Sequence, residues 1–376
     1  MKLTVLMIRR CTRAALLILV FGLGSTPGIA QSTYYEFFFP EIFFGRQPSA
    51  RAEAMGRSGV AMEGELLCAY YNPAGIASLS GFSIATAFAN PFYMLKNATY
   101  FYVSAGGKIG NIGSLSFSRY RFNWNDPFIM YDNWQNETGR IEPTQTQYVL
   151  SAAGDVMHGT SIGVSVGVLA YDPHLQGKPN QDKYRKEQTV SLDIGALHRI
   201  TLRSNEWTQQ HLTLGLSINN ITGASLNYDA RDNALPSLVR VGAVYKHIMR
   251  KSTSEFALNP FEGLLTIEYQ DLLNGNVRHG FHTGMECRIY EIVAVRIGYY
   301  SERATAVLIG YPNKEFLSSF TWGFGLEFPI AKLVREDFPM MIRCDLTSLN
   351  QPLYTNEDVF HFKKFSSYTL QLSYRY

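Results

Sequence analysis

From Gly81 to the C-terminus, apolar side chains recur at every second position in one short segment after another. The pattern is clear in Ser161–Ala170, His211–Asn219 and Thr321–Phe328, where apolar residues alternate with small or polar ones. Successive side chains of a β-strand point to opposite faces, so each segment has one apolar and one polar face. Strands of a soluble β-sandwich have the same property, and the number of segments is what separates the two folds.

These segments number about fourteen, and each is about ten residues long. They lie near residues 82–89, 100–108, 112–122, 144–154, 161–171, 187–198, 211–221, 237–246, 263–271, 278–290, 292–302, 319–328, 340–348 and 367–376. An even number of strands of this length is typical of a barrel that crosses a bilayer with tilted strands. We therefore predict an all-β fold, a transmembrane antiparallel β-barrel of about fourteen strands over residues 81–376.

The connections and the composition agree with this prediction. Connections such as 123–143, 172–186 and 303–318 are long, whereas 109–111 and 290–291 are tight, and long outer loops with short periplasmic turns are the bacterial pattern. The connection 248–262 is the exception, because it lies on the periplasmic side and is longer than a short turn. Charged residues make up 17% of the chain, against roughly 25% in soluble domains. The net charge of +3 gives no reason to expect nucleic acid.

Residues 1–30 are predicted to be a cleaved secretory signal peptide. Lys2–Arg13 carries the basic residues, Ala14–Leu23 is small and apolar, and Gly28–Ala30 supplies small residues before the cleavage point. The apolar run is too short to be a stable transmembrane helix. Together with a barrel, such a peptide predicts the outer membrane of a Gram-negative bacterium, with outer-membrane lipid as a partner.

Residues 31–80 lack the alternation and are predicted to form a plug inside the barrel lumen. The stretch 34–44 is rich in aromatic residues, which is too apolar for a solvated tail. Further on, Asn72 can cap a helix and Pro73 suits its first turn. We expect Tyr35, Phe38 and Tyr71 to be shielded as plug or ligand contacts. Deletion of Gln31–Ser80 should leave the barrel able to insert, since every strand pairs with its neighbours without it.

Pro48–Ala61 followed by Tyr71–Ala77 resembles the start of the PorV/PorQ group, which is similar to the FadL (OmpP-type) family of outer-membrane transporters. Leu235–Gly242, Gly284–Arg288 and Val295–Tyr299 agree with the same group. The resemblance implies a fourteen-stranded barrel with an N-terminal plug. It implies a plug or hatch motif made of Asn72, Pro73, Ala74 and Gly75. FadL relatives pass fatty acids and other hydrophobic compounds, whereas PorV helps type IX secretion by holding exported cargo.

Two groups of residues are candidate sites. Strand parity sends charged side chains into the lumen, among them Arg240, Glu268, Glu286, Arg288 and Arg296. They form either a polar conduit or cargo contact, or an internal ion-pair lattice that holds the plug, and the norm in such barrels favours the lattice. The loop 123–143 carries the aromatic residues Trp124, Phe128, Tyr131 and Trp134. These either anchor the barrel at the headgroup level or form a capture surface for an oily ligand or a protein tail.

Neither a cofactor nor a metal site is expected. His279 and His282 lie an odd number of residues apart on a strand and therefore face opposite ways. After removal of the signal peptide three cysteines remain, Cys68, Cys287 and Cys344, at irregular spacing that fits neither a disulfide framework nor zinc. No nucleophile with its base forms a local motif, so we expect no enzyme, and a membrane-embedded hydrolase is the least favoured hypothesis.

The favoured function is that of a non-enzymatic accessory or cargo-binding component of type IX-like secretion, with secretion subunits or exported proteins as partners. The alternative is FadL-like transport of hydrophobic compounds such as fatty acids. Strand parity adds one expectation about stability. Replacing Val164 or Leu214 on the lipid face by arginine should lower the stability of the barrel by about 2–4 kcal/mol if the residue lies near mid-bilayer. Replacing Ser165 or Thr213 should lower it much less.

Overall fold

The structure is a computed structural model, and it describes residues 47–90, 98–124, 128–131, 136–177, 185–226, 233–250, 258–273, 279–303, 316–334, 338–353 and 361–375. The predicted signal peptide, Tyr35, Phe38 and Trp134 lie outside the described residues.

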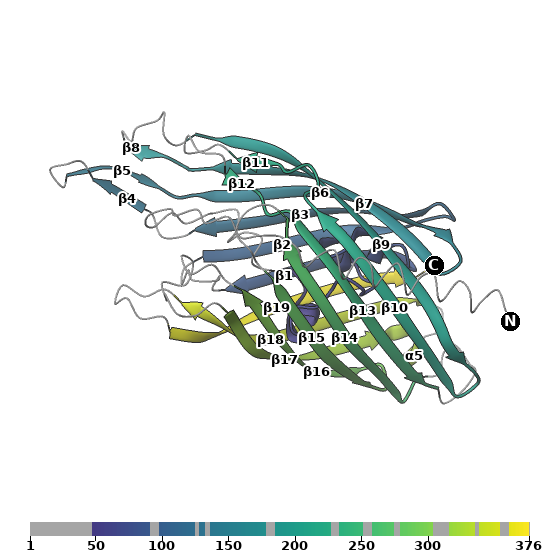
Figure 1. The fold of residues 1–376 in the computed structure, drawn as a ribbon. Helices are drawn as coiled ribbons and strands as arrows, with labels where there is room; N and C mark the ends of the chain where they lie inside the picture. The colour runs from purple at the N-terminus through teal and green to yellow at the C-terminus, as the bar shows by residue number, and fades with distance from the viewer. Residues whose placement is uncertain are drawn as a thin grey trace. The chain divides into compact units, whose positions relative to one another are not determined.

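Fourteen antiparallel strands form a closed barrel (Figure 1). They are Gly81–Asn90 (β1), Ala98–Ile109 (β2), Gly113–Trp124 (β3), Thr144–Met157 (β6), Thr160–Asp172 (β7), Glu187–Ser204 (β9), Thr208–Asn219 (β10), Leu238–Met249 (β13), Phe261–Leu272 (β14), Gly280–Ile289 (β15), Val293–Arg303 (β16), Phe316–Pro329 (β17), Met340–Leu353 (β18) and His361–Arg375 (β19). Each strand pairs with the next one along the barrel sequence, and β1 closes the ring by pairing with β19. The predicted barrel of about fourteen strands is confirmed.

Some strands are longer than the alternation predicted. β9 continues to Ser204 and β19 begins at His361, because backbone pairing with β10 and β18 continues beyond the predicted stretches. The pairing of β9 shifts register once, between Thr201 and Arg203, whereas that of β19 does not shift. In β9 the alternation in fact continues at Ile200 and Leu202, whereas residues 361–366 of β19 are mostly polar and show no such period. Hydrogen bonding between neighbouring backbones, not side-chain polarity, sets where a strand ends.

Shorter strands and a short helix lie in the connections at the two ends of the barrel. One end carries the long connections, and we call it the long-loop end. There Phe128–Tyr131 (β4), Glu137–Ile141 (β5) and Gln176–Gly177 (β8) form a small sheet, and Ser225–Leu226 (β11) pairs with Asn233–Ala234 (β12). At the opposite, short-turn end the connection from β17 to β18 contains the helix Ile330–Leu333 (α5). None of the helices in the described ranges has the length and apolar character needed to cross a membrane.

Burial across the barrel wall is the reverse of that in a soluble protein. Val164 and Leu214 are 41% and 43% exposed, whereas their strand neighbours Ser165 and Thr213 are 1% and 3% exposed. The same alternation gives the other strands an apolar outward face. An apolar surface this extensive is not stable in water, since soluble monomers rarely expose contiguous patches above a few hundred Å². The outward face is suited to hydrocarbon.

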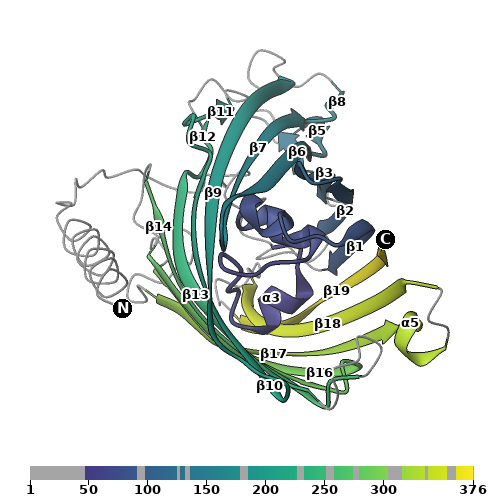
Figure 2. The same ribbon diagram turned by 90° about the vertical axis from the view of Figure 1, so that its right-hand side faces the viewer.

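The lumen is filled by residues 47–80, which we call the inner segment (Figure 2). It contains Ala50–Ala54 (α3), Leu66–Tyr70 (η1) and Pro73–Ile76 (η2). Helix α3 contacts β16, β17, β18 and β19, whereas η2 contacts β3, β6, β7 and β9. The inner segment therefore touches opposite sides of the wall and crosses the lumen.

Candidate functional site

The inner segment is a series of capped turns. The Ser49 side chain accepts a hydrogen bond from the Ala52 amide at the start of α3. The Asn72 side chain accepts one from the Ala74 amide, and Pro73 occupies the first position of η2. Each cap satisfies a backbone donor that a helix start leaves free. The sequence-based expectation that Asn72 caps a short helix is met.

Asn72 also fixes the inner segment to the barrel wall. Its amide nitrogen donates to the Val60 carbonyl at 2.8 Å and to the strand carbonyls of Ala196 and Leu216 at 3.0 and 3.3 Å. Asn72 is completely buried, so its donors and acceptor need partners, and all of these partners are backbone groups. One side chain thus connects a turn of the inner segment to strands β9 and β10.

Glycines on the inward face allow this close approach. A Cβ atom at Gly195 would lie 1.9 Å from Asn72 Oδ1, and one at Gly298 would lie 1.9 Å from the Gly56 nitrogen. No side chain larger than hydrogen fits at either position. Inward glycines on five further strands face the inner segment in the same way: Gly163, Gly215, Gly242, Gly284 and Gly323.

One side of the lumen carries a dense cluster of ion pairs, which we call the ionic wall. Its members are Arg51, Glu65, Glu286, Arg288, Arg296, Glu327, Arg343 and Asp345. Arg51 donates from Nε and Nη2 to the two carboxylate oxygens of Glu286, at 2.8 and 2.6 Å. Glu65 pairs with both Arg51 and Arg343. The inner segment supplies one cation and one anion to this cluster, and β15–β18 supply the rest.

The ionic wall is neutral as a whole. It holds four arginines and four carboxylates, and each is nearly buried. Burial alone would raise the pKa of Glu65, but Arg343 and Arg51 outweigh it and lower that pKa from 4.5 to about 2. Glu65 is therefore ionised at neutral pH, and the charges of the inner segment are compensated where they lie.

Between the two sides, backbone groups of the inner segment bind polar wall residues. The Gly59 and Val60 amides donate to Glu268 Oε2 at 2.6 and 2.8 Å. His282 Nδ1 lies 2.7 Å from the Gly56 carbonyl oxygen. His282 is fully buried and His279 is not, so the two histidines face opposite ways as expected. Within the described ranges, no group of three or more His, Cys, Asp or Glu could hold a metal ion.

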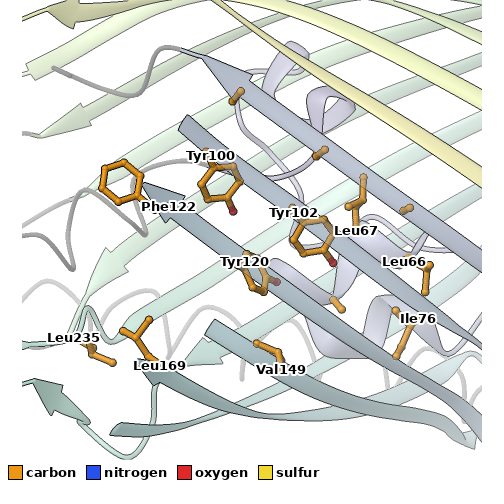
Figure 3. Close-up of a cluster of buried hydrophobic side chains, with 14 of the residues drawn as sticks. Leu66, Leu67, Ile76, Tyr100, Tyr102, Tyr120, Phe122, Val149, Leu169 and Leu235 are labelled. Carbon is orange, nitrogen blue, oxygen red and sulfur yellow. The ribbon is translucent and has the colours of Figure 1, made fainter. Parts of the chain in front are cut away.

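The other side of the lumen is aromatic and apolar. We call the inward-facing residues of β2, β3 and β7 toward the long-loop end the aromatic wall: Tyr100, Tyr102, Tyr120, Phe122, Leu169 and Tyr171. Figure 3 labels all of them except Tyr171. The rings of Tyr102 and Tyr120 lie 4.6 Å apart in an edge-on arrangement. Leu226 and Leu235 join this cluster from the long-loop end, and Leu66 and Ile76 join it from the inner segment. A continuous cluster of buried apolar side chains thus extends from the long-loop end to the inner segment.

Tyr70 stands where the apolar clusters meet. It packs against the aromatic wall and against the second cluster around Val60 and Tyr71. Its ring lies 5.7 Å from that of Tyr120, and the guanidinium of Arg240 lies 5.8 Å from the Tyr70 ring and 5.4 Å from the Tyr71 ring. Tyr70 is only half-buried, so it forms part of the inner segment's surface toward the long-loop end.

The residues singled out from the sequence fall into three groups. Asn72, Pro73, Ala74, Gly75 and Tyr71 are buried in the inner segment. Arg240, Glu268, Glu286, Arg288 and Arg296 are buried on the inward face, the last three in the ionic wall. Trp124, Phe128 and Tyr131 have a described backbone, at the end of β3 and in β4, but their side chains lie outside the description.

Sequence reasoning missed the aromatic wall. Tyr100 and Tyr102 lie two positions apart on β2 and therefore on the same face of that strand, and the same holds for Tyr120 and Phe122 on β3. Both pairs stand on the face that carries the serines of their strands, and that face is the inward one. The signal in the sequence was the presence of large aromatic residues on the strand face that otherwise carries small residues.

Comparison with known proteins finds similar solved structures but no matching family. No family model matches the chain, and no curated protein matches it. Among solved structures, the chain is similar to the CymD monoaromatic hydrocarbon channel, with 10% identity, a TM-score of 0.48 and coverage of 88% of this chain and 98% of that one. It is also similar to the Ralstonia pickettii toluene transporter TbuX, with 11% identity, a TM-score of 0.46 and coverage of 89% and 99%. The Pseudomonas putida toluene transporter TodX gives 9% identity, a TM-score of 0.44 and coverage of 88% and 98%.

These similar structures are described as channels or transporters, not enzymes. At such low identity, what these proteins carry does not define what this chain carries. The resemblance to the PorV/PorQ group stays a prediction, because no family model matches. What the fold and the contacts define is a fourteen-stranded barrel whose lumen is crossed by its own N-terminal residues.

Proposed function

We propose that the protein is an outer-membrane barrel that takes up small hydrophobic compounds from the cell exterior, with residues 31–80 as its plug. The long-loop end then faces outward and the short-turn end faces the periplasm, as in bacterial barrels generally. The apolar outward surface supports placement in a membrane, and the buried inner segment supports a lumen closed to free diffusion of water and ions.

The aromatic wall is the observation that carries this proposal. The inward face of a water-filled barrel is polar. Here Tyr100, Phe122 and Leu169 line that face instead and continue to Leu235 toward the exterior. Aromatic and aliphatic side chains bind apolar compounds through area removed from water and give little to ions or sugars. The wall is therefore suited to guide an apolar molecule to the plug.

The proposal is tested by uptake of radiolabelled toluene into cells that make the protein. Phe122→Ser on the inward face should lower the initial uptake rate by about tenfold, because the methylene and ring contacts that it removes are worth 1–3 kcal/mol. The matched control is Phe117→Ser, which makes the same change on the outward face of the same strand. The proposal fails if both variants take up toluene like the unaltered protein, or if that protein gives no uptake above cells without it.

The accessory role in secretion stays a prediction from the sequence. It rests on the resemblance of Pro48–Ala61 to the PorV/PorQ group and on the long connections. Affinity purification from detergent extracts tests it, since recovery of neither an exported protein nor a secretion subunit counts against it. No contact among the described residues favours it over uptake.

A further inference from the structure

The outward face of β3 changes character along its length. Near the short-turn end it presents Leu115 and Phe117, which are 39% and 52% exposed. The next two outward positions are Arg119 and Arg121, both half-buried. The inward positions between them, Ser118 and Tyr120, are buried, so the two arginines lie on the outer surface and not in the lumen. With a rise of about 3.3 Å per residue, their Cα atoms are about 7 Å apart along the strand.

A polar cavity of about 500 Å³ adjoins Arg121 on this outer surface. Arg121 and Asn123 of β3, Thr144 of β6 and the loop residues His174–Gln176 line it, together with Glu142. Cavities on the lipid-facing side of a barrel wall are expected to be apolar. This one is polar and lies beside the long-loop end, where the apolar face of β3 stops.

The two arginines retain unused hydrogen-bonding capacity. Arg119 Nε is buried without a hydrogen-bond partner, so only the Nη groups of Arg119 can face a ligand, and its guanidinium lies 5.9 Å from the centre of the Tyr148 ring. Arg121 Nε donates to Asn123 Oδ1 at 2.9 Å, which orients the guanidinium. A guanidinium carries five N–H donors, so most of those on Arg121 are available to a ligand.

The other charged groups near the cavity are already engaged. Glu142 Oε1 accepts a hydrogen bond from Gln176 Nε2 at 3.3 Å. Asp172 accepts from the His174 amide at 3.0 Å and pairs with Lys186 at 2.7 Å. Among the described residues that line the cavity, Arg121 therefore supplies the cationic donors, although Glu142 lies within the lining and limits the anionic charge that can be accepted.

We propose that Arg119 and Arg121 form a binding site for the phosphate headgroup of a membrane lipid, with the acyl chains lying along the outward Phe117 and Leu115. Arginine forks match phosphate oxygens with paired N–H donors. The apolar band directly toward the short-turn end provides hydrocarbon contact that a free anion does not use. The occupant is a phosphorylated lipid, and the site is independent of what passes through the lumen.

Native mass spectrometry of the full chain in detergent tests this site with three probes. These are dioctanoyl phosphatidic acid, dioctanoylglycerol with the same chains but no phosphate, and inorganic phosphate with no chains. We expect phosphatidic acid to remain bound and the other two to dissociate. Arg119→Gln combined with Arg121→Gln should weaken phosphatidic acid binding by about tenfold or more, since each lost contact is charge-assisted.

Lys108→Gln is the matched control, because Lys108 is an exposed cation at the opposite end of the neighbouring strand. It should leave phosphatidic acid binding unchanged, and all variants should keep the compact migration of a folded barrel in unheated gels. Equal binding of dioctanoylglycerol would overturn the proposal in favour of an apolar surface only. Equal binding of inorganic phosphate would overturn it in favour of a free anion site. Full retention of phosphatidic acid by the double variant would exclude the arginines.

Discussion

The ionic wall and the aromatic wall hold the same inner segment by different physical means. On one side, Arg51 and Glu65 enter a neutral cluster whose partners have fixed directions. On the other, Leu66 and Ile76 pack against rings and aliphatic chains that have no single required geometry. Charge-assisted hydrogen bonds depend steeply on position, whereas apolar contact depends on area. The ionic wall and the hydrogen bonds of Asn72 to β9 and β10 fix where the inner segment lies, and the aromatic wall tolerates small displacements beside it.

This difference bears on the proposed uptake. An apolar compound can displace apolar contacts at little cost, because it replaces them with contacts of the same kind. It cannot displace buried ion pairs without leaving charges uncompensated. We therefore expect compounds to pass along the aromatic wall while the ionic wall keeps the plug in place.

The largest effect should follow deletion of Gln31–Ser80, which removes the inner partner of both walls. The barrel should still insert, because Arg288, Arg296 and Arg343 remain balanced by Glu286, Glu327 and Asp345. Single-channel recording should then show a large new conductance. Unchanged conductance would mean that the segment does not close the pore, and the uptake proposal would lose its main structural support.

The second largest effect should come from removing one member of the ionic wall. Glu286→Ala leaves Arg51, Arg288 and Arg296 with one counter-charge too few in a buried cluster. The free energy of unfolding in urea should fall by about 3–5 kcal/mol. Combining it with Arg51→Leu should recover part of the loss, because the cluster is neutral again. A double variant as unstable as the sum of the two single ones would show that the pair is not coupled.

Acid should loosen the ionic wall selectively. The folded-state pKa of Glu65 is about 2, below its ordinary value of 4.5, so its contribution to stability is fully present above 4.5. That contribution should be lost as the pH falls from 4.5 toward 2. Limited proteolysis of the inner segment across this range measures the loosening. Glu65→Gln is the control, and its proteolysis should show a weaker pH dependence over the same window.

The smallest effect should come from a change within the aromatic wall that keeps its area. Tyr102→Phe removes a hydroxyl that lies 2.9 Å from Ser118 Oγ but leaves the ring in place. We expect a loss of about 0.5–1.5 kcal/mol in the free energy of unfolding, the net value of one hydrogen bond. A loss as large as that of Glu286→Ala would contradict the contrast between the two walls.

Much of the barrel was predictable because its signal is local. The alternation in segments such as His211–Asn219 shows which side chains lie on each face of one strand. Strands β9, β10 and β13 then pair with one another in the order in which they follow along the barrel. The cap at Asn72 was predictable for the same reason, since its partners lie two residues away. Strand parity also predicted inward charges such as Arg240, Glu286 and Arg296, but not Arg51 and Glu65 of the inner segment.

The contents of the lumen depend on contacts between distant residues, which local patterns do not report. Arginine at Ser165 or Thr213 was expected to cost much less than at Val164 or Leu214 on the lipid face. In the structure Ser165 is buried and donates a hydrogen bond to Ser151 Oγ, and Thr213 is buried as well, so an arginine at either position would meet packed atoms. A filled lumen makes inward positions as restrictive as a protein core.

Alternation and strand length are properties of neighbouring residues, so the amino-acid sequence alone was enough to predict a barrel of about fourteen strands with one apolar face. That the charges gather on one side of the lumen and the aromatic rings on the other follows from the folded structure. Arg51 and Glu286 lie 235 positions apart in sequence, and nothing in either local pattern encodes their contact. The closure of the sheet around the inner segment brings them together, and it leaves the aromatic wall as the apolar side of the lumen.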